Sequence, residues 1–295
     1  MESRAGPAAA TVRGVIDTAH TALGSVRYEL LPFDGAVRAA ALVERPLTLT
    51  VTCSPRHGID ATVDVACRLR ALGHTVVPHM AARMVRDTGH LDELLDRLAS
   101  AGIDDVFLVG GDAAEPHGDY GSALDLIAAL REHTRAPRRI GVAAYPEGHP
   151  LIDASGLHAA LLQKAGYADY MVSQLCFDMS VLRRWLAATR AAGVELPLLV
   201  GAPGIVDRRR LLEVSMRIGV GASVRFVRKQ RGLRRLLGLD GDAAERLATA
   251  VVPLIGTELG VAGVHFFTFN RLVETVRFVD RRSAEPSPIG ASRRT

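Results

Sequence analysis

Asp104–Asp112 runs Asp-Asp-Val-Phe-Leu-Val-Gly-Gly-Asp. Four apolar residues lead directly into two glycines and an acid, a pattern typical of a buried parallel strand that ends beside a ligand. The glycines let the backbone approach the ligand closely, and the carboxylate can face it. Asp112 is therefore the first candidate functional residue. On this segment alone, an ordinary turn with Asp112 as a helix N-cap remains an alternative.

Short apolar runs of this kind recur along the chain, with amphipathic helical segments between them. Apolar residues follow helical spacing at Leu91, Leu94, Leu95 and Leu98, and again at Leu124, Ile127, Ala128 and Leu130. The candidate strands are Val26–Leu31, Leu47–Thr52, Thr75–His79, Asp105–Val109, Arg139–Ala144, Tyr170–Gln174, Pro197–Gly201 and Gly263–Thr268. Eight strand–helix alternations predict an α/β fold, a closed (β/α)8 TIM barrel in a single domain. A doubly wound open sheet is the alternative, but no G-x-G-x-x-G follows any strand.

Length and charge fit one such domain. The chain has 295 residues, and 36 basic residues nearly balance 32 acidic ones, so we expect an anionic small-molecule ligand before nucleic acid. We predict an N-terminal extension, partly disordered, over residues 1–25. The barrel catalytic domain is expected over 26–282, and a flexible C-terminal tail over 283–295.

The cysteines and the N-terminal region bear on the compartment. Cys53, Cys67 and Cys176 are an odd number without a short paired spacing, which argues against a disulfide framework or a structural zinc site. No basic start with an apolar core opens the chain, and no run reaches the roughly 18 apolar residues of a membrane span. We therefore expect a cytoplasmic protein with no membrane partner. The oligomeric state stays open, and a homo-oligomer is compatible with the sequence.

Polar residues gather where the predicted strands end, which is where a barrel of this type builds its active site. They are Glu29, Thr52, His79, Asp112, Tyr145, Glu147, His149, Gln174, Thr268, Asn270 and Arg271. Glu29 interrupts the first strand, and a carboxylate that faces the barrel is costly to bury unless it is paired or protonated. Such a residue suits general-acid catalysis. The alternative is an outward-facing glutamate that meets an arginine on a covering helix.

The segment Tyr145-Pro146-Glu147-Gly148-His149-Pro150 brings an aromatic ring, an acid and an imidazole to one strand end. It is expected to line a pocket, although a proline-stiffened turn with His149 as a cap is the alternative. His79, His149 and a carboxylate have the residue types of a metal site, but their divergent spacing makes this a weak hypothesis, and no metal is expected.

The neutral amides Gln174 and Asn270 can donate and accept together, as recognition of a pterin or purine edge requires. Both are equally compatible with a structural role. The basic run Arg225–Arg235 is usually a solvated face, although it is able to bind phosphates or a glutamate chain. No aromatic ladder accompanies it, so no nucleic-acid partner is expected.

Several motifs in this order resemble the methylenetetrahydrofolate reductase family. They are Tyr28-Glu29-Leu30-Leu31-Pro32, Pro78-His79, Val109-Gly110-Gly111-Asp112, Ala144–Pro150, Ser173-Gln174-Leu175-Cys176-Phe177-Asp178 and His265-Phe266-Phe267-Thr268-Phe269-Asn270-Arg271. The resemblance implies an eight-stranded α/β barrel that reduces 5,10-methylenetetrahydrofolate to 5-methyltetrahydrofolate, usually through bound FAD.

The resemblance also implies roles for individual residues. Glu29 corresponds to the general acid that protonates N10 and opens the five-membered ring, and Asp112 to the aspartate beside the pterin. The folate-binding set is Gln174, Phe177, Asn270 and Arg271. The cofactor-binding set is Thr52, His79, Gly110, Gly111, Tyr120, Tyr145 and His149.

The chain departs from the family where FAD phosphates are held. The family usually has arginine at the position of Gly110, and it places Asp, Asn and a basic pair where this chain has Gly156, Ala159, Leu162 and Gln163. The lost charge-assisted contacts make FAD binding doubtful. The pattern resembles the flavin-free actinobacterial branch, in which NADH or NADPH passes hydride directly to the folate. The alternatives are an FAD-dependent reductase and a non-catalytic folate- or nucleotide-binding barrel.

Overall fold

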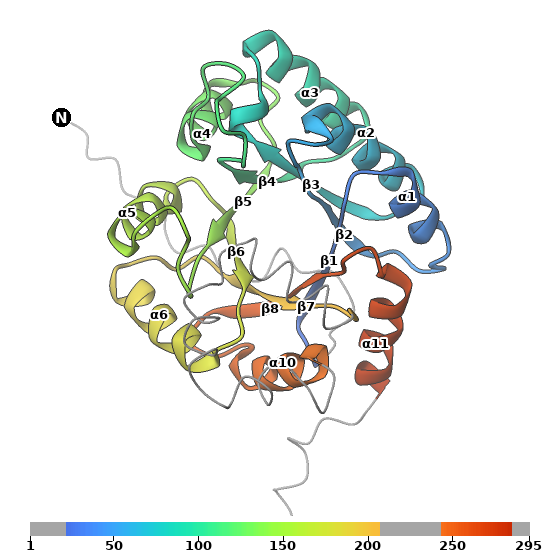
Figure 1. Ribbon diagram of the computed structural model, residues 1–295, viewed down its shortest axis with the longest axis vertical. Coiled ribbons are helices and arrows are strands. Elements are labelled where there is room, and N and C mark those ends of the chain that lie inside the picture. Colours follow the sequence, from blue (N-terminus) through green and yellow to red (C-terminus); the bar gives the residue numbers. More distant parts are fainter. Residues whose placement is uncertain (1–21, 207–242, 285–295) are drawn as a thin grey trace, which may run out of the picture.

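Eight β-strands pair in sequence order, each parallel to the next, and β8 returns to β1 to close a barrel. Figure 1 shows the strands in the middle and the helices around them. The computed structural model describes residues 22–206 and 243–284. The closed parallel barrel confirms the predicted single-domain TIM barrel and excludes the open sheet.

Every predicted strand is present, with ends shifted by no more than about two residues, as is usual for boundaries set by pattern alone. The strands are β1 (Ser25–Leu30), β2 (Thr48–Val51), β3 (Thr75–Ala81), β4 (Asp105–Val109), β5 (Arg139–Ala144), β6 (Tyr170–Leu175), β7 (Leu198–Pro203) and β8 (Val261–Phe267). The α-helices within residues 22–206 and 243–284 are α1 (Asp34–Ala41), α2 (Gly58–Ala71), α3 (Thr88–Ser100), α4 (Ala123–Glu132), α5 (Ala154–Ala165), α6 (Met179–Ala191), α10 (Ala243–Val251) and α11 (Leu272–Ala284). The same residues include the 3₁₀ turns η1 (Ala82–Met84) and η2 (Val252–Leu254).

The helical periodicity holds fully for α3 and partly for α4. The predicted leucines of α3 are all buried. In α4 the buried face is Ala123, Leu126, Ile127 and Leu130, whereas Ala128 is exposed. The prediction for Ala128 was wrong because the i, i+3, i+4, i+7 pattern begins at Ala123, directly after the N-cap.

The barrel interior is apolar at mid-height. Val77, Phe107, Tyr170, Val172 and Leu199 form a cluster there, separate from the main core between strands and helices. Gly141 makes room for the Tyr170 ring, because a Cβ at residue 141 would lie 2.3 Å from it. This packed layer closes the barrel, so polar chemistry is left to the strand ends.

Three sequence predictions fall wholly or mainly outside the described residues. They are the N-terminal extension over residues 1–25, the tail over 283–295 and the basic run Arg225–Arg235. Of the first two segments the structure describes only residues 22–25, where β1 begins at Ser25, and residues 283–284, which end α11. In the described part of the chain, no helix combines the length and apolarity needed to cross a membrane.

Candidate active site

Glu29 faces the inside of the barrel, because side chains alternate along β1. It is the next-to-last residue of that strand, so it lies at the end of the barrel where the strands end, which we call the barrel mouth. Tyr28 and Leu30 are 2% exposed and belong to the main core beneath the helices, where Tyr28 stacks on Phe266 of β8. Glu29 therefore points to the opposite side, and its side chain is 16% exposed. The outward-facing alternative for Glu29 is wrong.

Two imidazoles flank this carboxylate. His265 Nε2 lies 3.2 Å from Glu29 Oε2 within hydrogen-bonding distance, and His79 Nε2 lies 3.9 Å from the same oxygen. Thr268 Oγ1 donates to the backbone oxygen of Glu29 at 2.6 Å, which ties β1 to the end of β8. Burial lowers the pKa of His79 to about 4, against the attraction of Glu29, so His79 is neutral near pH 7.

Several buried polar atoms around Glu29 have no hydrogen-bond partner among the described residues. They are Thr50 Oγ1, Thr52 Oγ1, His79 Nε2 and His265 Nδ1. Thr50 is the β2 residue in register with Glu29. Buried polar groups are rarely left unpaired, so this cluster indicates a polar mouth that water or a ligand completes.

A buried ion network lies deeper in the barrel. Asp105 Oδ2 is 3.3 Å from Arg27 and 3.5 Å from Arg139, and Asp105 Oδ1 accepts a hydrogen bond from the Tyr170 hydroxyl at 2.8 Å. The Arg27 guanidinium also lies over the Tyr170 ring, 4.1 Å from its centroid. Burial raises the pKa of Asp105, and Arg27 and Arg139 oppose that rise. The network places a buried group of opposite charges below Glu29, in which Arg27 Nη1 has no hydrogen-bond partner among the described residues.

The two glycines before Asp112 differ in what the fold requires. Gly111 has φ +97°, and a Cβ there would lie 3.0 Å from the Cβ of Ala81, so the backbone needs glycine. At Gly110 a Cβ would meet nothing within 4 Å. A side chain at residue 110 would therefore fit, so the fold does not require glycine at this position.

Asp112 is exposed and does not cap the following helix. Ser122 caps α4, in a capping box with Asp125, so the N-cap alternative is wrong. The charge of Asp112 acts on the next loop. Burial raises the pKa of Tyr145 and Asp112 adds to that rise, whereas burial lowers the pKa of His149 and Asp112 opposes it. Asp112, Tyr145 and His149 therefore share one side of the mouth.

The loop after β5 forms a turn that brings the rings of Tyr145 and His149 into contact. Tyr145 and His149 meet edge to face, with centroids 5.1 Å apart. Asp153 caps α5, so His149 is not its cap. Of the two histidines considered for a metal, His79 lies beside Glu29 and His149 lies beside Tyr145. Among the described residues no group of three or more His, Cys, Asp or Glu is arranged to hold a metal ion.

The remaining candidates occupy different environments. Gln174 is the next-to-last residue of β6, and its Oε1 accepts a hydrogen bond from the backbone N–H of Leu175 at 2.9 Å. Phe177 is half-buried in the next loop. Asn270 and Arg271 are exposed after β8, where Asn270 has φ +69°, which is uncommon for a residue with a side chain. Tyr120 is only 6% exposed and packs in the main core.

Sequence reasoning assigned no role to His265, although its motif was noted. His265 lies two residues before Phe267 on the inward face of β8, and it is 1% exposed. The i, i+2 alternation of a strand was the signal that pointed it toward Glu29. Arg27 was missed in the same way, since it precedes Glu29 by two residues.

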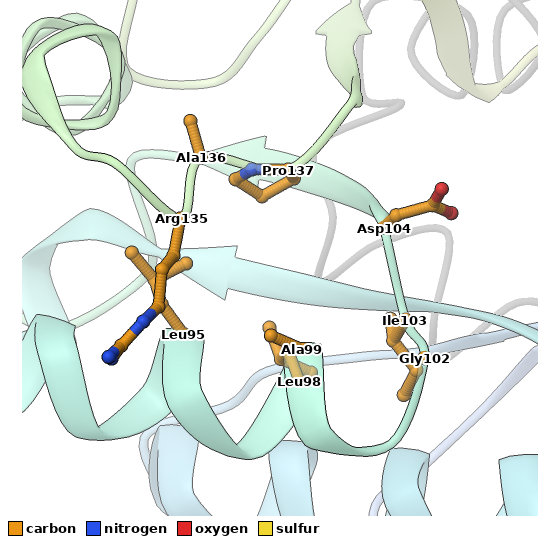
Figure 2. A pocket seen from close by; sticks show the side chains of 9 residues that line it. All are labelled: Leu95, Leu98, Ala99, Gly102, Ile103, Asp104, Arg135, Ala136 and Pro137. Atoms are coloured by element: carbon orange, nitrogen blue, oxygen red, sulfur yellow. The ribbon is translucent and has the colours of Figure 1, made fainter.

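A cavity of about 320 Å³ lies away from these residues. It is lined by the end of α3, the Gly102–Asp104 loop before β4 and the Arg135–Pro137 loop before β5, as Figure 2 shows. The charged ends of Asp104 and Arg135 point away from each other, and Arg135 pairs with Asp96. Both loops precede strands, so the cavity is at the barrel end opposite Glu29, and apart from Asp104 and Arg135 its lining is apolar or glycine.

Comparison with known proteins bears on this arrangement. A family model described as methylenetetrahydrofolate reductase matches residues 35–281. Methylenetetrahydrofolate reductase 1 of Schizosaccharomyces pombe is 26% identical over 220 residues, covering 71% of this chain and 35% of its own length. Methylenetetrahydrofolate reductase (NADH) 1 of Arabidopsis thaliana is 28% identical over 183 residues, covering 53% of this chain and 29% of its own length. The chain thus spans about a third of these relatives.

Among solved structures, one from Clostridium thermocellum is similar in fold. It is described as an uncharacterized protein that binds two copies of 5-methyl-5,6,7,8-tetrahydrofolic acid. The TM-score is 0.61 at 13% identity, over 88% of this chain and 94% of that one. At this identity the likeness shows the barrel fold alone.

Proposed function

Because this chain belongs to the methylenetetrahydrofolate reductase family, we propose that it reduces 5,10-methylenetetrahydrofolate to 5-methyltetrahydrofolate, with NADH or NADPH as hydride donor. The observation that carries the proposal is the Glu29 carboxylate at the barrel mouth, held by His265 at 3.2 Å. In the proposed reaction this carboxyl group supplies the acid.

The proposal assigns proton transfer to Glu29. Protonation of N10 breaks the bond between N10 and the bridging methylene carbon, which remains on N5 as a cationic iminium. His265 Nε2 lies within hydrogen-bonding distance of this carboxyl group, and an imidazole nitrogen donates or accepts according to its tautomer. Since His79 stays neutral, it adds no positive charge that would oppose the iminium.

The second proposed role is that of Asp112. Hydride adds to the iminium carbon and leaves a methyl group on N5, and the nicotinamide is released in oxidised form. An anion beside the pterin stabilises the cation more than the neutral ring-closed substrate, so its benefit falls on the transition state. The exposed Asp112 after Gly111 suits this role, because no helix cap occupies its carboxylate.

We propose that hydride passes directly from the nucleotide to the folate. The chain's residues do not fit an FAD diphosphate, because Gly110 leaves open space where the family usually has arginine. Residues Ala159, Leu162 and Gln163 are exposed on α5 and carry no charge where relatives have ionic contacts. An anionic diphosphate would lose its charge-assisted partners there.

The binding roles follow the family by position. Gln174, Phe177, Asn270 and Arg271 are proposed to bind the folate. The dinucleotide is proposed to contact Thr52, His79, Gly110, Gly111, Tyr120, Tyr145 and His149. The unpaired Thr52 Oγ1 and the free space over Gly110 support a ligand on this side, whereas the deep burial of Tyr120 supports only an indirect role.

The test is oxidation of NADH by the purified protein with methylenetetrahydrofolate, without added flavin. We expect a colourless protein and folate-dependent NADH oxidation that Glu29→Gln largely removes. Activity only after FAD addition, or a flavin absorbance retained through gel filtration, would replace direct transfer with the flavin route. Folate binding without NADH oxidation, both with and without added FAD, would show that the chain is a folate-binding barrel and would refute the proposed reductase activity.

A further inference from the structure

Glu147 reaches from its own loop to the neighbouring one. It lies after β5, yet its Oε1 accepts hydrogen bonds from the backbone N–H groups of Phe177 and Asp178, at 2.7 and 2.8 Å. The Cys176 thiol donates to the same oxygen at 3.5 Å. These contacts are charge-assisted and join the loops that follow the adjacent strands β5 and β6 (Figure 1).

The loop after β6 depends on this carboxylate. The chain leaves the sheet after Leu175, and α6 begins at Met179. The Asp178 side chain is already engaged as the N-cap of α6, where it accepts from the N–H groups of Ser180 and Val181. Glu147 is the acceptor that the structure gives to the backbone N–H of Phe177 and to that of Asp178, so it fixes the path between strand and helix.

The loop after β5 depends on Glu147 much less. The Gly148 N–H donates to the Tyr145 carbonyl at 3.0 Å, and the Leu151 N–H donates to His149 Nδ1 at 3.2 Å. These local bonds hold the turn that carries Tyr145 and His149. Loss of the Glu147 carboxylate would therefore release the loop after β6 and leave the loop after β5 in place.

We propose that Glu147 is a positioning residue that holds the folate-binding loop through the backbone of Phe177 and Asp178. The inference rests on the proposed function, since it takes Gln174 and Phe177 as folate contacts. It adds a role for Glu147 that acts through neighbouring residues, without contact with the reacting atoms. Loss of Glu147 should therefore affect folate binding through Gln174 and Phe177, while the proposed nucleotide contacts Tyr145 and His149 stay in place.

Three variants separate positioning from other roles. Glu147→Ala removes the acceptor. Glu147→Asp keeps the charge but withdraws the carboxylate by one methylene, about 1.5 Å, beyond hydrogen-bond reach of both N–H groups. Glu147→Gln keeps an oxygen at the position of Oε1. The matched control is Glu93→Ala, which removes an exposed glutamate from α3.

The first readout is amide hydrogen exchange, which needs no activity. We expect faster exchange at Phe177 and Asp178 in the Ala and Asp variants, and near wild-type exchange in the Gln variant and the Glu93 control. Unchanged exchange in Glu147→Asp would overturn the proposal, and this variant also serves if Glu147→Ala fails to fold. If the wild type shows no reductase activity, the proposed function falls, while exchange still tests the loop contact.

The second readout is steady-state kinetics. For the Ala and Asp variants we expect the KM for methylenetetrahydrofolate to rise on the order of 10- to 100-fold, the range that loss of one hydrogen bond to a charged group produces, with the NADH KM within about threefold. Glu147→Gln should stay within about threefold for both substrates. Equal increases in both KM values, or a Gln variant as impaired as the Ala variant, would refute positioning through Oε1.

Discussion

Replacement of Glu29 by Gln tests the centre of the proposed mechanism. Glutamine keeps the size of the side chain, and it can face His265 Nε2 with either end of its amide because that nitrogen donates or accepts. The cost in folding is therefore limited to about 1 kcal/mol, the net value of one hydrogen bond. For a domain of this size that corresponds to a fall in Tm of roughly 2–4 °C.

The expected cost in catalysis is much larger. The amide has no proton to give to N10, and general-acid catalysis is typically worth about 10²- to 10⁴-fold. That range corresponds to about 3–5 kcal/mol of transition-state stabilisation, several times the loss in folding. We therefore expect kcat to fall at least on the order of 100-fold while Tm and folate affinity stay close to wild type.

The assay is initial-rate NADH oxidation at saturating folate, with thermal unfolding and folate binding measured on the same preparations. Glu93→Ala is the matched control, because it removes an exposed carboxylate from α3, away from the proposed site, and is expected to keep kcat. A Glu29→Gln variant with kcat within threefold of wild type, or a loss no larger than that of Glu93→Ala, would refute the role of Glu29 as the acid.

Three further predictions concern single residues. Asp112→Asn should lower kcat more than folate affinity, with Tm unchanged because α4 is capped by Ser122; a normal kcat would remove Asp112 from the mechanism. Gly111→Ala should destabilise the fold by about 1–3 kcal/mol in urea unfolding, since φ is +97° and Ala81 is close, whereas Gly110→Ala should change stability by less than about 1 kcal/mol. His79 remains neutral in the fold down to pH about 4 but is protonated below its ordinary 6.5 when unfolded. Below pH 6.5 the unfolded chain binds more protons than the folded one. The wild-type free energy of unfolding should therefore decrease by up to about 3 kcal/mol as the pH falls from 6.5 to 4, and that of His79→Asn should decrease less. Parallel curves of unfolding free energy against pH for the two proteins would contradict the buried neutral imidazole.

Some features of the candidate site follow from local pattern. The run that ends at Gly110–Asp112 predicted both a strand and a loop, because strand burial and glycine conformation are properties of neighbouring residues. The position of Glu29 on the first strand likewise placed it at the barrel mouth once eight strands were counted. The same pattern could not decide whether Glu29 faces into the barrel or toward the helices. Its chain neighbours Tyr28 and Leu30 are buried, and a barrel strand has a buried environment on both of its faces.

The alternation of strands and helices, the number of strands and hence the barrel can all be predicted from the amino-acid sequence, because apolar residues recur with periods of about 2 residues in strands and 3.6 in helices. The partners of those side chains could be identified only in the folded protein. His265 approaches Glu29 from 236 positions away because β8 closes against β1, and Asp105 joins Arg27 across 78 positions. The hydrogen bond from the backbone N–H of Phe177 to Glu147 could not be predicted from the sequence either. It depends on how two loops pack, and any residue with a backbone N–H could donate it. Periodicity is local, whereas barrel closure brings distant strands together, so the chemistry at the mouth is set by contacts that no segment contains alone.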